Sequence, residues 1–171
     1  MLVISIVISA ALSRLLPHVP NVTPIAAVAL FSGAYLADRR LAVLVPLAAM
    51  LVSDLILGFY GPGEMAAVYL SFTLVVALGF WVSEKRSTTR IASAAITASL
   101  LFFVITNFAV WAFGTMYPKS AAGLAECYIA ALPFFRYTLA GDLSCTLLLF
   151  GGFALLEQSF PVLRERAAAL R

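Results

Sequence analysis

The chain has 171 residues, of which 63% are hydrophobic and only 11% charged, and its formal net charge is +3. Soluble domains contain about 45–50% apolar and about 25% charged residues, so this composition excludes a water-soluble globular fold. The basic residues form short clusters between apolar runs, a pattern that membrane topology explains and that does not indicate nucleic-acid binding. We therefore predict one all-α domain over residues 1–171, a polytopic helical bundle in the lipid bilayer with about six transmembrane helices.

The first predicted span covers residues 2–16, an apolar segment that ends near Arg14. It has no basic start and no A-x-A cleavage site, which favours a retained helix over a removed signal peptide. Three prolines in the segment 17–24 break this helix. Thr23 can cap the second predicted span, 24–37, whose first turn accommodates Pro24.

The second span is rich in alanine and glycine. Ala26, Leu30 and Ala34 follow one another at intervals of four residues, so they share one face of a helix. Small residues on one face allow helices to pack closely. This face predicts either close packing inside the bundle or docking of a partner membrane subunit, and the sequence leaves both open.

Four further spans follow from apolar runs separated by turn residues and charges. Turn residues at 58–64, polar residues at 83–90 and the proline-containing stretch 116–119 mark their limits. A short segment at 121–132 is expected to end before Pro133, because proline interrupts a regular helix. The remaining spans are predicted at 41–58, 66–82, 91–114 and 135–157, followed by an amphipathic basic tail to Arg171.

The distribution of Lys and Arg among the loops predicts the orientation of the chain. If the chain starts inside, the inner side receives eight of the eleven basic residues, which are Arg39, Arg40, Lys85, Arg86, Arg90, Arg164, Arg166 and Arg171. An odd number of spans would place the basic tail outside. We therefore expect both termini in the cytoplasm of a bacterium, with the chain in its inner membrane.

With this topology, polar and aromatic residues gather toward the outer side, as in the lining of a pocket. Asp54 is the clearest case, because a carboxylate in hydrocarbon costs about 2.5–3.5 kcal/mol on insertion scales. Asp54 should face the bundle interior and have a partner, for which Arg14 and Arg136 are available cations. A structural Asp–Arg pair and a contact with a ligand or ion both remain open.

The sequence contains little that indicates catalysis or metal binding. His18 is the only histidine, and Cys127 and Cys145 lack CxxC spacing, so we expect no metal site, no disulfide and two buried thiols. No Gly-x-Ser-x-Gly, Walker A or HExxH motif occurs. Asp142 follows a glycine but lacks the first glycine of the Gly-x-Gly-Asp motif of intramembrane aspartyl proteases. We expect that the protein is not an enzyme and that any ATP-driven function needs a partner.

Several motifs occur in order between about residue 10 and residue 157. They are SRLLPH at 13–18, PNVTPIAA at 20–27, SDLILGF at 53–59, TNFAVW at 106–111, MYP at 116–118, ALPFF at 131–135 and GDL at 141–143. In these motifs the chain resembles DUF6580, a bacterial family of transport-type proteins whose function is unknown. That family is similar in size and topology to the vitamin-binding S-components of energy-coupling factor (ECF) transporters.

The resemblance implies uptake of a small molecule, a vitamin or a related micronutrient, bound from the outer side. It also implies docking on an ECF-type transmembrane subunit and two ATPases. Solitary cobalamin transporters of the BtuM type are similar in the Arg-x-x-Pro-His and Ser-Asp segments, but their cobalt-ligating cysteine has no counterpart after Asp54. Cobalamin is thus one candidate for the transported substrate, and no bound cofactor is expected.

We predict a substrate site formed by residues that share the outer half of the bundle. Its polar groups would fix the orientation of the substrate, and its aromatic groups would supply contact area. The predicted site residues are His18, Asn21, Asp54, Tyr69, Asn107, Trp111, Tyr128, Arg136 and Asp142. Two rival hypotheses are an intramembrane enzyme that uses its carboxylates or a cysteine, and a structural or assembly protein that has no ligand.

Overall fold

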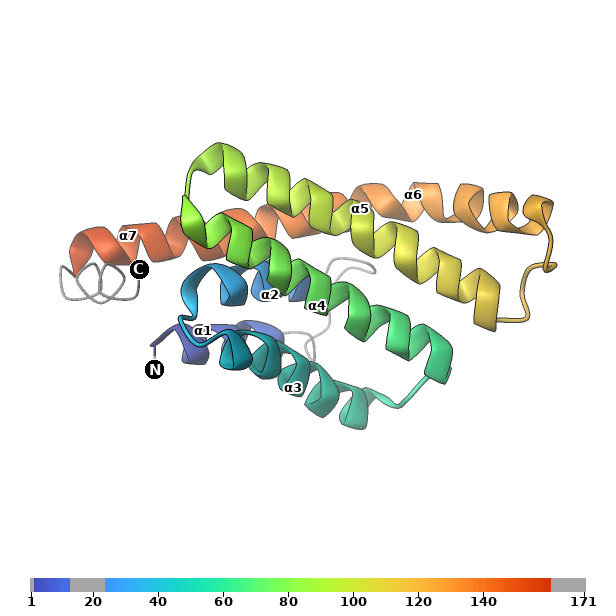
Figure 1. The fold of residues 1–171 in the computed structure, drawn as a ribbon, viewed down its shortest axis with the longest axis horizontal. Helices are drawn as coiled ribbons and strands as arrows, with labels where there is room; N and C mark the ends of the chain where they lie inside the picture. The colour runs from blue at the N-terminus through green and yellow to red at the C-terminus, as the bar shows by residue number, and fades with distance from the viewer. Residues whose placement is uncertain (1, 13–23, 161–171) are drawn as a thin grey trace.

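The computed structural model describes residues 2–12 and 24–160, and within these ranges it consists of helices joined by short connections, without strands (Figure 1). The predicted all-α membrane bundle is confirmed. The helices are α1 (Leu2–Leu12), α2 (Ile25–Tyr35), α3 (Arg39–Leu57), α4 (Pro62–Glu84), α5 (Thr88–Phe113), α6 (Ala121–Thr146), the π-helix η2 (Leu147–Gly151) and α7 (Gly152–Ser159).

Four helical stretches in the described part of the chain are long and apolar enough to cross a membrane. They are α3, α4, α5 and the continuous helix from Ala121 to Ser159. By contrast, α1 and α2 have 11 described residues each, which correspond to about 16 Å of helix, whereas the hydrocarbon core is about 30 Å thick. The chain is therefore a multi-pass membrane protein, and the second of the six predicted spans forms a shorter apolar helix, α2, while only residues 2–12 of the first span are described.

The predicted break at Pro133 is wrong. Pro133 lies inside α6, and α6, η2 and α7 follow one another as one helix of 39 residues. Proline removes one backbone hydrogen bond, but a lipid-exposed interruption would leave several groups unpaired, so an apolar segment tends to stay helical across it. At about 58 Å, this helix is longer than the hydrocarbon core of a bilayer.

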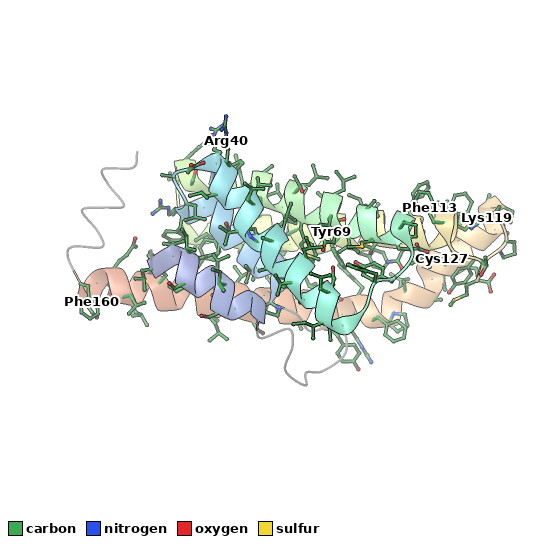
Figure 2. All side chains as sticks on the ribbon, turned by 90° about the horizontal axis from the view of Figure 1, so that it is seen from below. Arg40, Tyr69, Phe113, Lys119, Cys127 and Phe160 are labelled. Carbon is green, nitrogen blue, oxygen red and sulfur yellow. The ribbon has the colours of Figure 1, made fainter. Side chains whose placement is uncertain are left out.

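The basic residues of the described chain gather mainly at one end of the bundle. Arg39 and Arg40 begin α3, Lys85 and Arg86 follow α4, and Arg90 lies in the first turn of α5. These five residues define what we call the basic end. At the distal end α5 is joined to α6, and Figure 2 shows Lys119 there, opposite Arg40. Figure 1 shows α1 and α2 side by side in the half of the bundle that contains the basic end.

Helix α2 is the centre of the bundle. Each of its residues from Ile25 to Ala34 is buried, although the helix is only three turns long. It packs against α1, α3, α4, α5 and α6. The predicted small-residue face is part of this core, since Ala26, Leu30 and Ala34 are 6%, 0% and 1% exposed. Close packing inside the bundle therefore occupies this face, and a partner subunit could not reach it without displacing the surrounding helices.

The backbones of α2 and α4 touch where two glycines face each other. A Cβ atom added to Gly79 would lie 2.5 Å from the carbonyl oxygen of Leu30 and 2.8 Å from the Cα of Gly33. A Cβ atom added to Gly33 would collide with the carbonyl oxygen of Val76. Because the obstacles are backbone atoms, no side-chain rotation can relieve these contacts. Glycine at both positions is the sequence requirement for the α2–α4 crossing.

Replacing Gly79 with alanine should therefore destabilise the bundle by about 1–3 kcal/mol, the usual cost of overpacking a core. The measurement is the unfolding free energy of the purified protein, titrated with a denaturing detergent. Gly152→Ala is the matched control, because a Cβ atom there meets nothing within 4 Å. Equal stability of the two variants would contradict the close contact.

Candidate functional site

The first candidate site is a hydrogen-bonded pair between α3 and α4. Asp54 lies one turn before the end of α3 and is 1% exposed, and the hydroxyl of Tyr69 on α4 donates to its Oδ2 at 2.8 Å. The apolar sequence around Asp54 makes the helix, and the short connection at 58–61 returns α4 alongside it. The structure thus brings together two of the predicted site residues, and it buries a carboxylate inside a span, as expected.

The expected Asp–Arg pair is not formed with Arg136. The guanidinium of Arg136 instead donates to the hydroxyl of Tyr137 at 2.8 Å and stacks over the same ring at 4.7 Å. Arg136 is exposed on α6. The other expected partner, Arg14, lies outside the described residues.

The second candidate site is a buried pair between α5 and α6. Asp142 is 5% exposed, and the hydroxyl of Ser99 donates to its Oδ2 at 2.7 Å. The two residues belong to the α5–α6 hairpin, whereas Asp54 and Tyr69 belong to the α3–α4 hairpin. Each carboxylate thus has a hydroxyl partner on its own neighbouring helix.

Three further predicted residues lie in the distal part of the α5–α6 hairpin, where Asn107 bonds within α5, Trp111 bonds to the turn and Tyr128 joins α6 to α5. The side-chain amide of Asn107 donates to the carbonyl of Phe103 at 2.8 Å, the indole N–H of Trp111 donates to the carbonyl of Pro118 at 2.9 Å, and the Tyr128 hydroxyl donates to the carbonyl of Val104 at 2.7 Å. Their polar atoms are therefore used within the hairpin.

Lys119 reinforces the same turn. Its ammonium donates to the carbonyl oxygens of Trp111 and Gly114. It also lies 5.8 Å from the centre of the Trp111 ring. The role of Lys119 at the C-terminus of α5 depends on the tertiary turn that follows.

The two cysteines are free thiols in the described structure. Cys127 is 2% exposed, and its thiol lies 3.4 Å from the carbonyl oxygen of Asn107, while Cys145 is partly buried. Among residues 2–12 and 24–160, no group of three His, Cys, Asp or Glu side chains could hold a metal ion. The predicted site residues His18 and Asn21 lie outside the described residues.

A cavity that the sequence did not predict lies at the basic end. Its volume is about 390 Å³, and it is bounded by the end of α2, the connection to α3 and the end of α4. Its lining includes the side chains of Tyr35, Arg39, Phe80, Ser83, Glu84 and Arg86. The sequence analysis explained Arg39 and Arg86 by membrane topology. Only the tertiary structure shows that both residues line the same cavity.

The Ser99–Asp142 bond gives a stability prediction. Ser99→Ala leaves a buried carboxylate without this donor and should reduce the unfolding free energy by about 1–3 kcal/mol. Detergent-denaturation curves of the purified protein measure the change. The control is Ser93→Ala on the same helix, because the exposed Ser93 hydroxyl bonds only to the carbonyl of Arg90. A loss that is the same in both variants would refute a stabilising role for the buried pair.

Comparison with known proteins gives one match. The sequence model of a family described as "Family of unknown function (DUF6580)" covers residues 1–163. No curated protein and no solved structure matches the chain.

Proposed function

For this chain, which belongs to the DUF6580 family, we propose a function as a membrane transport protein that binds a small molecule between its helices. The observation that supports this proposal is the Asp54–Tyr69 pair. Ionisable side chains inside membrane spans are rare because they are costly to bury, and they commonly mark the path or the binding site of a substrate. Asp54 is almost fully buried and already has an oriented donor.

The proposal extends to the mode of uptake that the S-component resemblance implies. In this view the substrate is a vitamin or related micronutrient, and an ECF-type transmembrane subunit with ATPases supplies the energy. Cobalamin remains a candidate substrate. Cys127 offers little support for cobalt ligation in this conformation, because its thiol is buried against the α5 backbone.

We also propose that the basic end faces the cytoplasm of a bacterium, with the chain in the inner membrane and both termini inside. The excess of Arg and Lys at this end follows the positive-inside rule. The Asp54–Tyr69 pair would then lie toward the outer side, since Asp54 is close to the distal end of α3.

Cysteine labelling tests this orientation. In a background with Cys127→Ala and Cys145→Ala, the exposed positions Thr89 and Met116 mark the basic and distal ends. A membrane-impermeant maleimide should label Met116→Cys in intact spheroplasts and Thr89→Cys only after permeabilisation. The reverse pattern would overturn the orientation.

Ligand binding tests the site itself. The purified full-length protein is titrated with a panel of vitamins, cobalamin included, and the dissociation constants are measured by calorimetry. Asp54→Asn should weaken binding of the cognate compound at least about tenfold, because truncating a buried charge interaction commonly costs 2 kcal/mol or more. Tyr69→Phe should weaken it less, since the carboxylate is retained.

The matched control for these variants is Thr73→Val, one turn further along α4. The Thr73 hydroxyl donates to the carbonyl of Tyr69 within the helix, so its loss removes a hydroxyl without touching Asp54. If no compound in the panel binds, and Asp54→Asn cells grow normally on limiting vitamins, the transport proposal fails. If Asp54→Asn lowers stability but leaves the affinity unchanged, the pair is structural.

A further inference from the structure

The cavity at the basic end combines space with positive charge, since Arg39 and Arg86 both line it. Its volume of about 390 Å³ falls in the range of 300–1,000 Å³ that is common for small-molecule sites. It lies between α2 and α4 at the end opposite to Asp54, and it is therefore separate from the transport site proposed above. We propose that this cavity binds a phosphate group, carried either by the headgroup of an anionic phospholipid or by a small soluble phosphate.

Arg86 is the first residue that points to an anion. Its guanidinium carbon lies 4.2 Å from the centre of the Tyr35 ring, so one face of the guanidinium is covered by the aromatic ring. Arg86 lines the cavity, so its positive charge is available to an anion there.

Arg39 contributes a second guanidinium to the same cavity. Its guanidinium carbon lies 5.4 Å from the centre of the Phe80 ring, which also lines the cavity. When aromatic rings cover the faces of guanidinium groups, the N–H groups remain available in the plane. Arginine presents these donors as a planar fork that matches the oxygens of a phosphate group.

The neighbouring carboxylates leave this positive charge only partly neutralised. Glu84 lines the cavity but forms its ion pair with Arg90 at 3.3 Å. Asp38 accepts hydrogen bonds from the backbone N–H groups of Arg40 and Leu41 and so caps α3. Glu157 approaches Arg86 only to 4.0 Å, the outer limit of an ion pair. The five basic residues of this end thus exceed its three acidic residues.

The location also favours a phosphate-bearing lipid over other anions of similar size. Basic pockets between transmembrane helices on the cytoplasmic side are typical binding sites of anionic headgroups. The cavity lies where three helix ends meet at one end of the bundle, and its walls carry aromatic rings as well as arginines. The phosphate oxygens of a headgroup would thus accept hydrogen bonds from the arginines while its glycerol contacts the rings.

Native mass spectrometry of the full chain in detergent, with added lipids, tests the proposal. Phosphatidylglycerol should bind, and phosphatidylcholine should bind at least about tenfold more weakly. Arg86→Gln and Arg39→Gln should each reduce phosphatidylglycerol binding about tenfold, as expected for the loss of a charge-assisted hydrogen bond. Arg40→Gln is the matched control, because Arg40 is exposed at the same end but does not line the cavity.

A second arm separates the two sources of phosphate. Glycerol 1-phosphate is titrated in the absence of added lipid, and binding is followed by a rise in melting temperature. Binding of the lipid alone assigns a headgroup site, and binding of both assigns a site for the phosphate itself. Absence of binding in both arms overturns the proposal.

Two controls distinguish the loss of a binding site in the cavity from unfolding of the variant and from a general effect of surface charge. Ala37→Phe places a side chain in the cavity without removing a charge, and it should also abolish binding while Arg39 and Arg86 remain. If Arg40→Gln reduces phosphatidylglycerol binding as much as Arg39→Gln does, the attraction is a general property of the basic end. That result would overturn the assignment to the cavity.

Discussion

The backbone contact between α2 and α4 at Gly33 and Gly79 determines where the other helices can lie. Because these two helices meet without side chains between them, α2 sits deep enough for α1, α3, α5 and α6 to surround it. The large apolar side chains of the outer helices then face outward, as Leu55, Leu147 and Leu148 do with exposures of 63–74%. In a bilayer this is the favourable arrangement, because lipid tails solvate leucine as well as a protein core does.

Polar contacts in this bundle occur mainly inside helical hairpins that are adjacent in the chain. Tyr69 and Asp54 join α3 to α4, and Ser99 and Asp142 join α5 to α6. Each pair lies on one of the hairpins that enclose α2. The hydrogen bonds therefore set the register within each hairpin, while the small residues of α2 allow the two hairpins to approach each other. The sequence left a structural and a ligand-binding role open for Asp54, and its hydrogen bond with Tyr69 accounts for the structural role.

The extent to which the sequence predicted the structure differs from one feature to another. Hydropathy located the membrane helices, because a span is a local property of about 20 residues. The sequence prediction was wrong at Pro133. Local propensity would end the helix there, but the membrane environment favours its continuation. Asp54 was recognised by the cost of its charge, but its partner Tyr69 could not be named without the α3–α4 pairing. The cavity at the basic end was missed, because Arg39 and Arg86 are far apart in sequence and only folding brings them to one space.

The π-helix η2 has a consequence for the alignment of the last helix. A π-turn accommodates one more residue than an α-turn, so it rotates everything that follows by about 100° relative to a regular helix. After this rotation, Phe153 lies 5.4 Å from the ring of Phe31 and Glu157 faces Arg86, while Phe150 within η2 lies 5.3 Å from the same Phe31 ring. The extra residue in η2 changes the direction in which the side chains of α7 point relative to those of α6. A homologue that lacked one residue in this segment would turn Glu157 away from Arg86, and the charge balance of the basic end would change without any substitution among the arginines.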